Sequence, residues 1–112
     1  MTLRVLLADD DARFRATVAQ VLAAAPDIAL VATAGDADEA VRRYLELAPD
    51  VVVLGDRIAA MERILAADPD TRIVVLDADR SPHPGACGVL AKDATPLLAP
   101  MLRMVAALAP HE

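Results

Sequence analysis

The chain has 112 residues and a formal net charge of −6; hydrophobic residues make up 56% of it and aromatic residues only 2%. This length suffices for one domain with an aliphatic core, so we expect residues 1–112 to form a single domain. The acidic balance and the absence of a Lys/Arg run argue against direct nucleic-acid binding by this chain. No apolar run approaches the roughly 20 residues that cross a bilayer. A single cysteine, Cys87, excludes an internal disulfide, so we expect a cytoplasmic protein with no membrane segment.

Five short runs of aliphatic and β-branched residues indicate strands that are buried on both faces. They cover residues 3–8, 28–32, 51–54, 72–76 and 87–91. Helical spacing of apolar residues follows most of these runs, so strands and helices alternate along the chain. This alternation predicts a parallel sheet with right-handed crossovers, and hence a three-layer α/β sandwich.

Aspartates mark the expected helix starts. Asp11 stands at the N-cap of a helix over residues 12–24, and Asp36 caps a helix that runs to about Leu47. Asp56 directly follows the strand at residues 51–54 and is expected to cap a short third helix.

The last helix has a proline at its predicted start. Thr95 followed by Pro96 is typical of an N-cap and first turn, and the helix is expected to reach about Leu108. Pro100 lies inside this pattern and can delay the true start, because proline lacks the N–H that a helix interior needs.

Four motifs, in this order, resemble the receiver domains of two-component response regulators, over nearly the whole chain. They are the acidic pair after the first strand, PDVVVL, TRIVVL, and GACGVLAKDA around Lys92. The resemblance implies a flavodoxin-like, five-stranded parallel sheet of order 2-1-3-4-5. The KDAT ending is most similar to the subclass with a C-terminal helix-turn-helix output domain, which implies a role in signal transduction or transcription regulation.

The resemblance also assigns the site. In such receivers an acidic pair helps to hold Mg²⁺, an aspartate ending the third strand accepts the phosphoryl group, and a Ser/Thr and a Lys bind its oxygens. Here Asp9 and Asp10 take the acidic-pair positions and Lys92 takes the lysine position. Gly55, however, takes the acceptor position and Asp77 the hydroxyl position. A carboxylate in place of the hydroxyl sets negative charge beside the phosphoryl group.

We therefore expect a degenerate receiver that acts without phosphorylation, as a regulatory module and not as an enzyme. Its acidic pocket would comprise Asp9, Asp10, Gly55, Asp56, Asp77 and Lys92. Lys92 would pair with Asp77 or Asp9 and hold the site closed. Weak Mg²⁺ binding by Asp9 and Asp10 stays open, and no other cofactor is expected. Two alternatives remain: a genuine phosphoacceptor that uses Asp56, and a small-ligand sensor.

Two intervals are shorter than the family usually shows, each by roughly two helical turns. Gly55 to Asp77 spans 22 positions and Asp77 to Lys92 spans 15. The third helix should therefore be shortened and the fourth missing. Residues 77–86 can reach about 33 Å when extended, and returning along a five-residue strand needs about 17 Å, so the crossover remains possible. One sheet face would be thinly covered near the site, and His83, between two prolines, is expected to be a solvated loop residue.

The final helix predicts self-association. Its sequence, LLAPMLRMVAALA, contains one charged residue, Arg103. A helix that is apolar nearly all round must be buried all round, and 112 residues offer no further layer to cover it. We expect a two-fold homodimer through this helix, besides an output domain or regulatory protein as a possible partner. The residues expected to divide between sheet and partner are Leu98, Leu102, Val105 and Leu108.

Overall fold

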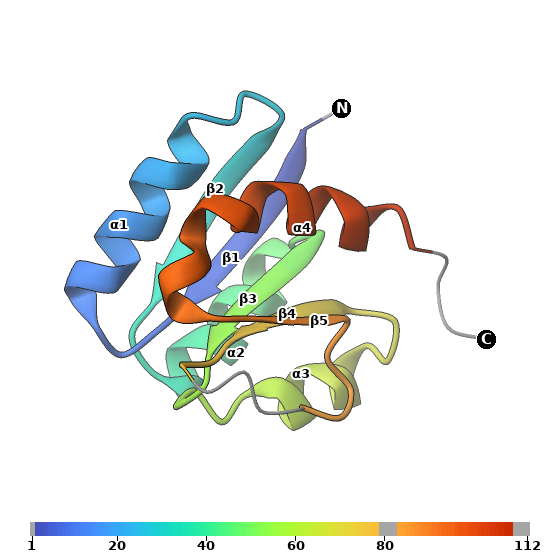
Figure 1. Ribbon diagram of the computed structural model, residues 1–112. Helices are drawn as coiled ribbons and strands as arrows, with labels where there is room; N and C mark the ends of the chain where they lie inside the picture. The colour runs from blue at the N-terminus through green and yellow to red at the C-terminus, as the bar shows by residue number, and fades with distance from the viewer. Residues whose placement is uncertain (1, 79–82, 109–112) are drawn as a thin grey trace.

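The computed structural model describes residues 2–78 and 83–108, in which strands and helices alternate (Figure 1). The strands are β1 (Leu3–Ala8), β2 (Ile28–Ala34), β3 (Val51–Gly55), β4 (Arg72–Leu76) and β5 (Gly88–Leu90). The helices are α1 (Ala12–Ala23), α2 (Ala37–Leu47), α3 (Met61–Ala67), the 3-10 helix η1 (Lys92–Leu97) and α4 (Leu98–Ala106). Within the described ranges, no helix has the length and apolar character that a bilayer crossing requires.

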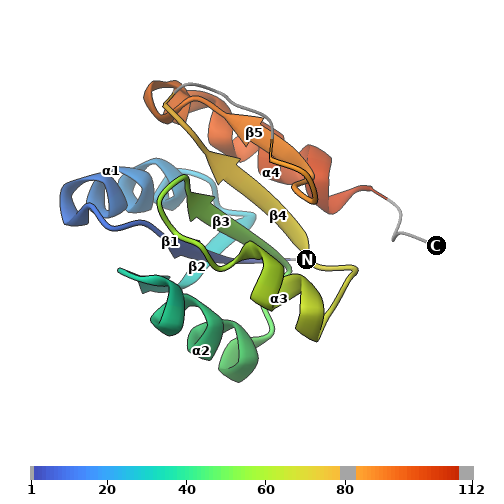
Figure 2. The ribbon, with the colours of Figure 1, turned by 90° about the horizontal axis from the view of Figure 1, so that it is seen from below.

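All strand pairs are parallel, and the sheet order is β2-β1-β3-β4-β5, which confirms the predicted topology. Helices α1 and α4 cover one face of the sheet, and α2 and α3 cover the other (Figure 2). Strand β3 lies in the middle and is completely buried, as its continuous apolar run predicts. Its side chains alternate between the two core clusters: Val51 and Val53 face α1 and α4, whereas Val52 and Leu54 face α2 and α3.

Two helix starts differ from the prediction. Helix α3 begins only at Met61, and Asp56 caps nothing: its backbone N–H donates to Leu76 O at 3.0 Å. Burial of Ile58 and Ala60 between the strand and the helix explains this, because the chain turns inward there before a helix can begin. The final helix likewise starts as the 3-10 segment η1, and Thr95 makes no capping hydrogen bond.

Other boundaries agree with the sequence. Asp11 accepts hydrogen bonds from the N–H groups of Arg13 and Phe14, and Asp36 accepts one from Glu39, as N-caps do. Pro100 lies in the first turn of α4, where its missing N–H costs no helical hydrogen bond. The third helix is short, with seven residues, and the described residues between β4 and β5 (77–78 and 83–87) contain no helix, as predicted.

The single charged residue of α4, Arg103, links this helix to the segment before β2. Arg103 donates from Nε and Nη2 to the two carboxylate oxygens of Asp27, at 2.7 and 2.8 Å. Asp27 immediately precedes β2, so the pair links the last helix to an edge strand. The hydrogen bonds from Arg103 lower the pKa of Asp27 from 3.8 to about 2.

We expect replacement of Arg103 by Gln to reduce stability in a pH-dependent way. Because the folded-state pKa of Asp27 is depressed, the pair stabilises the fold fully above about 3.8, and this contribution is lost as the pH falls towards about 2. Urea unfolding of the wild type and Arg103→Gln at a series of pH values measures this. The difference between the two midpoints should shrink between pH 3.8 and 2; a constant difference would contradict the assignment.

Candidate functional site

Asp9 lies at the carboxyl edge of the sheet, directly after β1, and is completely buried. Its Oδ1 accepts a hydrogen bond from the N–H of Asp11 at 2.9 Å, and its backbone oxygen accepts one from Arg15 Nη1 at 2.6 Å. Its own N–H donates to Ala34 O at 3.0 Å. Backbone and side chain are therefore both fixed, so the carboxylate has one defined position.

The carboxylate of Asp9 fills the space beside Gly55. Ala8 pairs with Leu54 in the sheet, so the residues that follow each of them are neighbours. A β-carbon added to Gly55 would lie 2.2 Å from Asp9 Oδ2 and 2.9 Å from Asp9 Cγ, far inside van der Waals contact. The place where a side chain at the end of β3 would begin is thus occupied by the side chain from β1.

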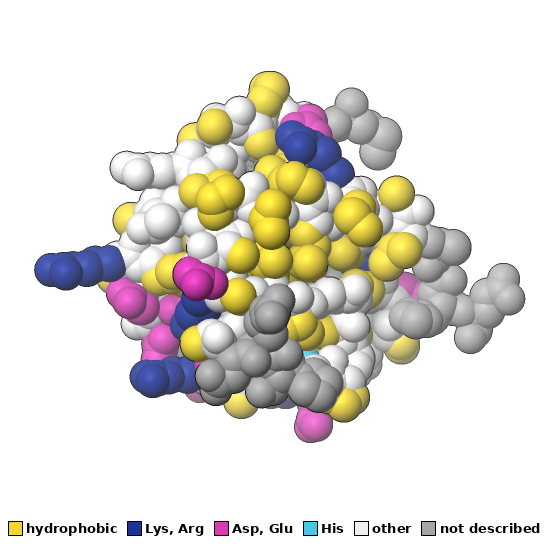
Figure 3. Space-filling model, in the orientation of Figure 1, with side chains coloured by type: hydrophobic (Ala, Val, Ile, Leu, Met, Phe, Trp, Pro, Cys, Tyr) yellow, Lys and Arg dark blue, Asp and Glu magenta, His cyan; other side chains and the backbone are white. Residues whose placement is uncertain are grey.

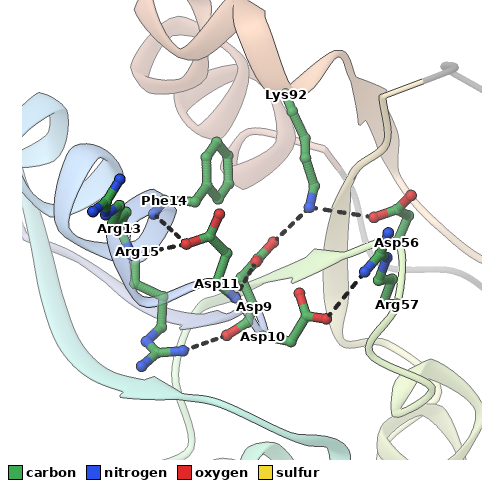
Figure 4. A network of polar contacts seen from close by, with 9 residues as sticks. All are labelled: Asp9, Asp10, Asp11, Arg13, Phe14, Arg15, Asp56, Arg57 and Lys92. Carbon is green, nitrogen blue, oxygen red and sulfur yellow. Dashed lines mark hydrogen bonds and ion pairs between the residues drawn. The ribbon is translucent and has the colours of Figure 1, made fainter.

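Lys92, the first residue of η1, reaches into the same place. Its Nζ lies 3.0 Å from Asp9 Oδ2 and 3.3 Å from Asp56 Oδ1 (Figure 4). The ammonium also lies 5.1 Å from the centre of the Phe14 ring, within cation–π range. Burial lowers the pKa of Lys92, but the ion pairs with Asp9 and Asp56 outweigh this effect, so the pKa is raised above 10.5. The lysine is therefore charged at neutral pH.

Asp10 takes a more exposed position than Asp9. Its Oδ2 lies 3.8 Å from Arg57 Nη1, with side chains that are 43% and 78% exposed. An ion pair that is so long and so exposed contributes little to stability.

Asp77 does not belong to the cluster around Lys92. Its side chain is 7% exposed, and Oδ2 lies 2.7 Å from Nε2 of His83. The sequence predicts that Lys92 pairs with Asp77 or Asp9, and that Asp56 caps a helix. In the structure Asp9 and Asp56 lie beside the ammonium of Lys92, whereas Asp77 does not. The prediction of a solvated His83 is also wrong, because its side chain is 25% exposed and hydrogen-bonded.

Three residues of the site were missed from sequence: His83, Phe14 and Arg15. Phe14 reads as an ordinary apolar position of a helix, and Arg15 as a solvated one, because nothing in the local pattern shows that the N-terminal turn of α1 faces the sheet edge. For His83 the flanking prolines indicate only a loop. The contact of Phe14 with Lys92 joins segments that are distant in sequence, whereas those of Arg15 and His83 depend on the course of irregular segments.

Curated bacterial proteins are similar to part of the chain, and two of them illustrate this, whereas no family model matches the chain. The transcriptional regulatory protein LiaR of Bacillus subtilis is 39% identical over 80 residues, which are 66% of this chain and 38% of LiaR. A protein-glutamate methylesterase/protein-glutamine glutaminase of Anaeromyxobacter dehalogenans is 40% identical over 83 residues, or 69% of this chain and 24% of that protein. The chain thus spans less than two fifths of either relative.

Solved structures match almost the whole chain. The response regulator domain of Thermotoga maritima CheB superposes with a TM-score of 0.83 and 21% identity, covering 98% of this chain and all of that one. A two-component response regulator of the LuxR family from Aurantimonas has a TM-score of 0.80 and 28% identity, covering 95% and 86% of the two chains. The chain is a response-regulator receiver domain.

A cavity of about 450 Å³ lies beside the acidic pocket of this receiver domain. Its apolar lining includes Leu54, Ile58 and Val75, and its polar lining includes Asp56 and His83. It lies on the α2 and α3 side of the sheet, since Leu54 and Val75 belong to that core cluster. This is the end of the sheet where ligands bind in open α/β folds.

Proposed function

We propose that this receiver domain acts without phosphoryl transfer, as a regulatory and dimerisation module in signal transduction. One observation carries the proposal: Asp9 Oδ2 lies where the side chain of an acceptor at position 55 would start, 2.2 Å from the β-carbon that Gly55 lacks. Transfer to the end of β3 needs a nucleophile there and room for an in-line phosphoryl group. Here position 55 has no side chain, and the buried carboxylate of Asp9 occupies the space beside it.

The charges of the pocket support the same proposal. In the family that the chain resembles, the lysine binds phosphoryl oxygens. Here Lys92 is bound to Asp9 and Asp56 at 3.0 and 3.3 Å, so its charge is compensated inside the protein. A site that is already neutralised in this way does not need a phosphoryl group to close it.

Intact mass spectrometry after incubation with acetyl phosphate and Mg²⁺ tests the proposal. We expect no gain in mass, while a phosphorylatable receiver treated in parallel gains one phosphoryl group. An adduct on the wild type that is lost in Asp56→Asn would overturn the proposal in favour of a phosphoacceptor.

The second candidate function is transfer to Asp56, and one observation favours it. The side chain of Asp56 does not cap α3 and is 28% exposed, and its Oδ1 lies 3.3 Å from Lys92 Nζ. An accessible carboxylate next to a lysine has the charge environment of an acceptor. Asp56 lies one residue beyond the end of β3. This position argues against transfer to Asp56, because consecutive residues of a strand point in different directions.

The partners proposed for this domain are proteins. Solved receivers with the same fold include CheY6 of R. sphaeroides in complex with the P1 domain of CheA3, and CheY of Borrelia burgdorferi in complex with CheX. LiaR, which is 39% identical over the matched residues, is a transcriptional regulatory protein. We accordingly propose control of an output domain or a regulatory protein, with transcription as the process, and no catalytic activity of this domain itself.

Three of the four residues predicted for the dimer surface are buried against the sheet. Leu98, Leu102 and Val105 are at most 4% exposed and lie in the core cluster with the sheet, so of the predicted interface only Leu108 is available to a partner. The outward apolar residues are instead Leu97, Met104 and Leu108, which are 57%, 72% and 49% exposed. Met101, which is half-buried, and Met104 lie on α4, and Leu97 and Leu108 flank this helix, so the four residues form an apolar stripe along it.

This outward stripe has no free charge within it, since the one charged side chain of α4, Arg103, is bound to Asp27. Hydrophobic side chains gather along α4 on this face of the molecule (Figure 3). A self-complementary apolar stripe suits a second copy of the same helix across a two-fold axis.

Substitution of Met104 by Asp should convert the proposed dimer to a monomer, because it buries a carboxylate at the centre of the stripe. Light scattering at micromolar concentration measures this. Leu45→Asp is the matched control: Leu45, like Met104, is an exposed hydrophobic residue, at 64%, but it lies on α2, so this variant should remain dimeric. A monomeric wild type under these conditions would refute the dimer.

If the domain senses a small ligand, the cavity beside Ile58 and Val75 is the candidate binding site. Its volume of about 450 Å³ falls in the range of ligand pockets. A thermal-shift panel of metabolites tests this role. A hit that is abolished by Ile58→Trp, which fills the cavity, would favour it.

A further inference from the structure

We propose that Lys92 is the resident cation of the acidic pocket and takes the place of a divalent metal ion. The resemblance to receivers implies Mg²⁺ bound to the acidic pair, but the donor atoms of this chain do not fit that ion. The inference does not require the proposed function, because metal binding and phosphoryl transfer are measured separately.

Both carboxylate oxygens of Asp9 already face donors of the chain. Oδ1 accepts the hydrogen bond from the N–H of Asp11 at 2.9 Å, and Oδ2 lies 3.0 Å from Lys92 Nζ. Apart from this ammonium, Oδ2 has no hydrogen-bond partner in the described part of the chain. Lys92 therefore supplies the positive charge that the buried carboxylate requires.

The other carboxylates of the pocket also face cations of the chain. Asp56 Oδ1 lies 3.3 Å from Lys92 Nζ, and Asp10 Oδ2 lies 3.8 Å from Arg57 Nη1. Mg²⁺ requires near-octahedral oxygen ligands at about 2.1 Å. Among the residues that the structure describes, no group of three or more acidic, histidine or cysteine side chains is arranged to hold a metal ion.

A divalent ion at Asp9 would have to displace the ammonium. Lys92 is one-quarter exposed and is held from three directions by Asp9, Asp56 and the ring of Phe14. The displaced ammonium would lose all three partners, whereas the ion would gain one buried carboxylate and the exposed Asp10. The balance therefore favours the lysine, and its raised pKa agrees with this.

Titration with Mn²⁺, followed by the electron paramagnetic resonance signal of the free ion, tests the inference. We expect no saturable binding to the wild type at millimolar Mn²⁺. Lys92→Met retains the length of the side chain without its charge, and should bind Mn²⁺ at least ten-fold more tightly. Arg42→Met is the control and should behave as the wild type, because Arg42 lies on α2, outside the pocket, where it pairs with Glu39. Adding Asp9→Asn to Lys92→Met should abolish the gained binding.

Saturable binding by the wild type, or none by a folded Lys92→Met, would overturn the inference. Should Lys92→Met fail to fold, carbon NMR of the Lys92 side chain decides with the wild type alone. Its Cε shift should not change with Mg²⁺; a saturable change would mean that the ion displaces the ammonium. Metal binding without a phosphoryl adduct would refute only this inference, and an adduct would refute only the proposed function.

Discussion

Replacing Lys92 by alanine should lower the free energy of unfolding by about 3 kcal/mol, the low end of the cost of breaking a buried ion pair by removing one partner. The low end applies because Lys92 is 25% exposed, whereas Asp9 is completely buried. The change leaves Asp9 Oδ2 without the cation that lies 3.0 Å from it, the one close cation among the described residues. Urea unfolding at neutral pH measures the difference.

Matched variants separate charge from packing at this position. Lys92→Arg retains the charge and should cost less than Lys92→Ala, and Arg57→Ala should change stability hardly at all. The folded-state pKa of Lys92 is raised above 10.5, so the contribution of its charge is complete below that pH and is lost as the pH rises beyond it. A loss below about 1 kcal/mol at neutral pH would show that the pair is only a surface contact.

Gly55→Ala should destabilise the fold by about 3 kcal/mol, the upper end of the cost of overpacking a core. The new β-carbon would collide with Asp9 Oδ2 at 2.2 Å, and that carboxylate cannot move without leaving Lys92. Gly35→Ala is the control, since its nearest contact would be an ordinary 3.4 Å to Arg15.

A double-mutant cycle identifies the collision as the cause. In an Asp9→Ala background the nearest remaining atom of residue 9 is Cβ, 3.4 Å from the added carbon, which is a tolerable contact. Gly55→Ala should then cost almost nothing, and the two substitutions should be strongly non-additive. Equal costs in both backgrounds would contradict the proposed competition for space.

The sheet was predictable because its signals are continuous in sequence. The run from Val51 to Leu54 is apolar at every position, and only a strand covered on both faces accounts for it. The nearness of Asp9 to Lys92 was predictable as well, because both follow strands whose carboxyl ends meet at one edge of the sheet.

The remaining details depend on contacts that local patterns do not contain. Asp56 fits an N-cap, but burial of Ile58 and Ala60 delays the helix and leaves Asp56 for Lys92. Similarly, α4 is apolar on two sides, so the period of its pattern does not determine which side faces the sheet. Leu98 and Leu97 are adjacent leucines, yet one is completely buried and the other 57% exposed.

The shared space of Asp9 and Gly55 restricts which side chains position 55 can acquire. A side chain regained at position 55 alone meets the carboxylate of Asp9 at 2.2 Å, and a change of Asp9 alone leaves Lys92 without its nearest partner. We expect each single step to be less stable than the present chain, so a side chain at position 55 requires a coordinated change at Asp9. In mutational terms the two positions are coupled: the residue tolerated at position 55 depends on the residue at position 9.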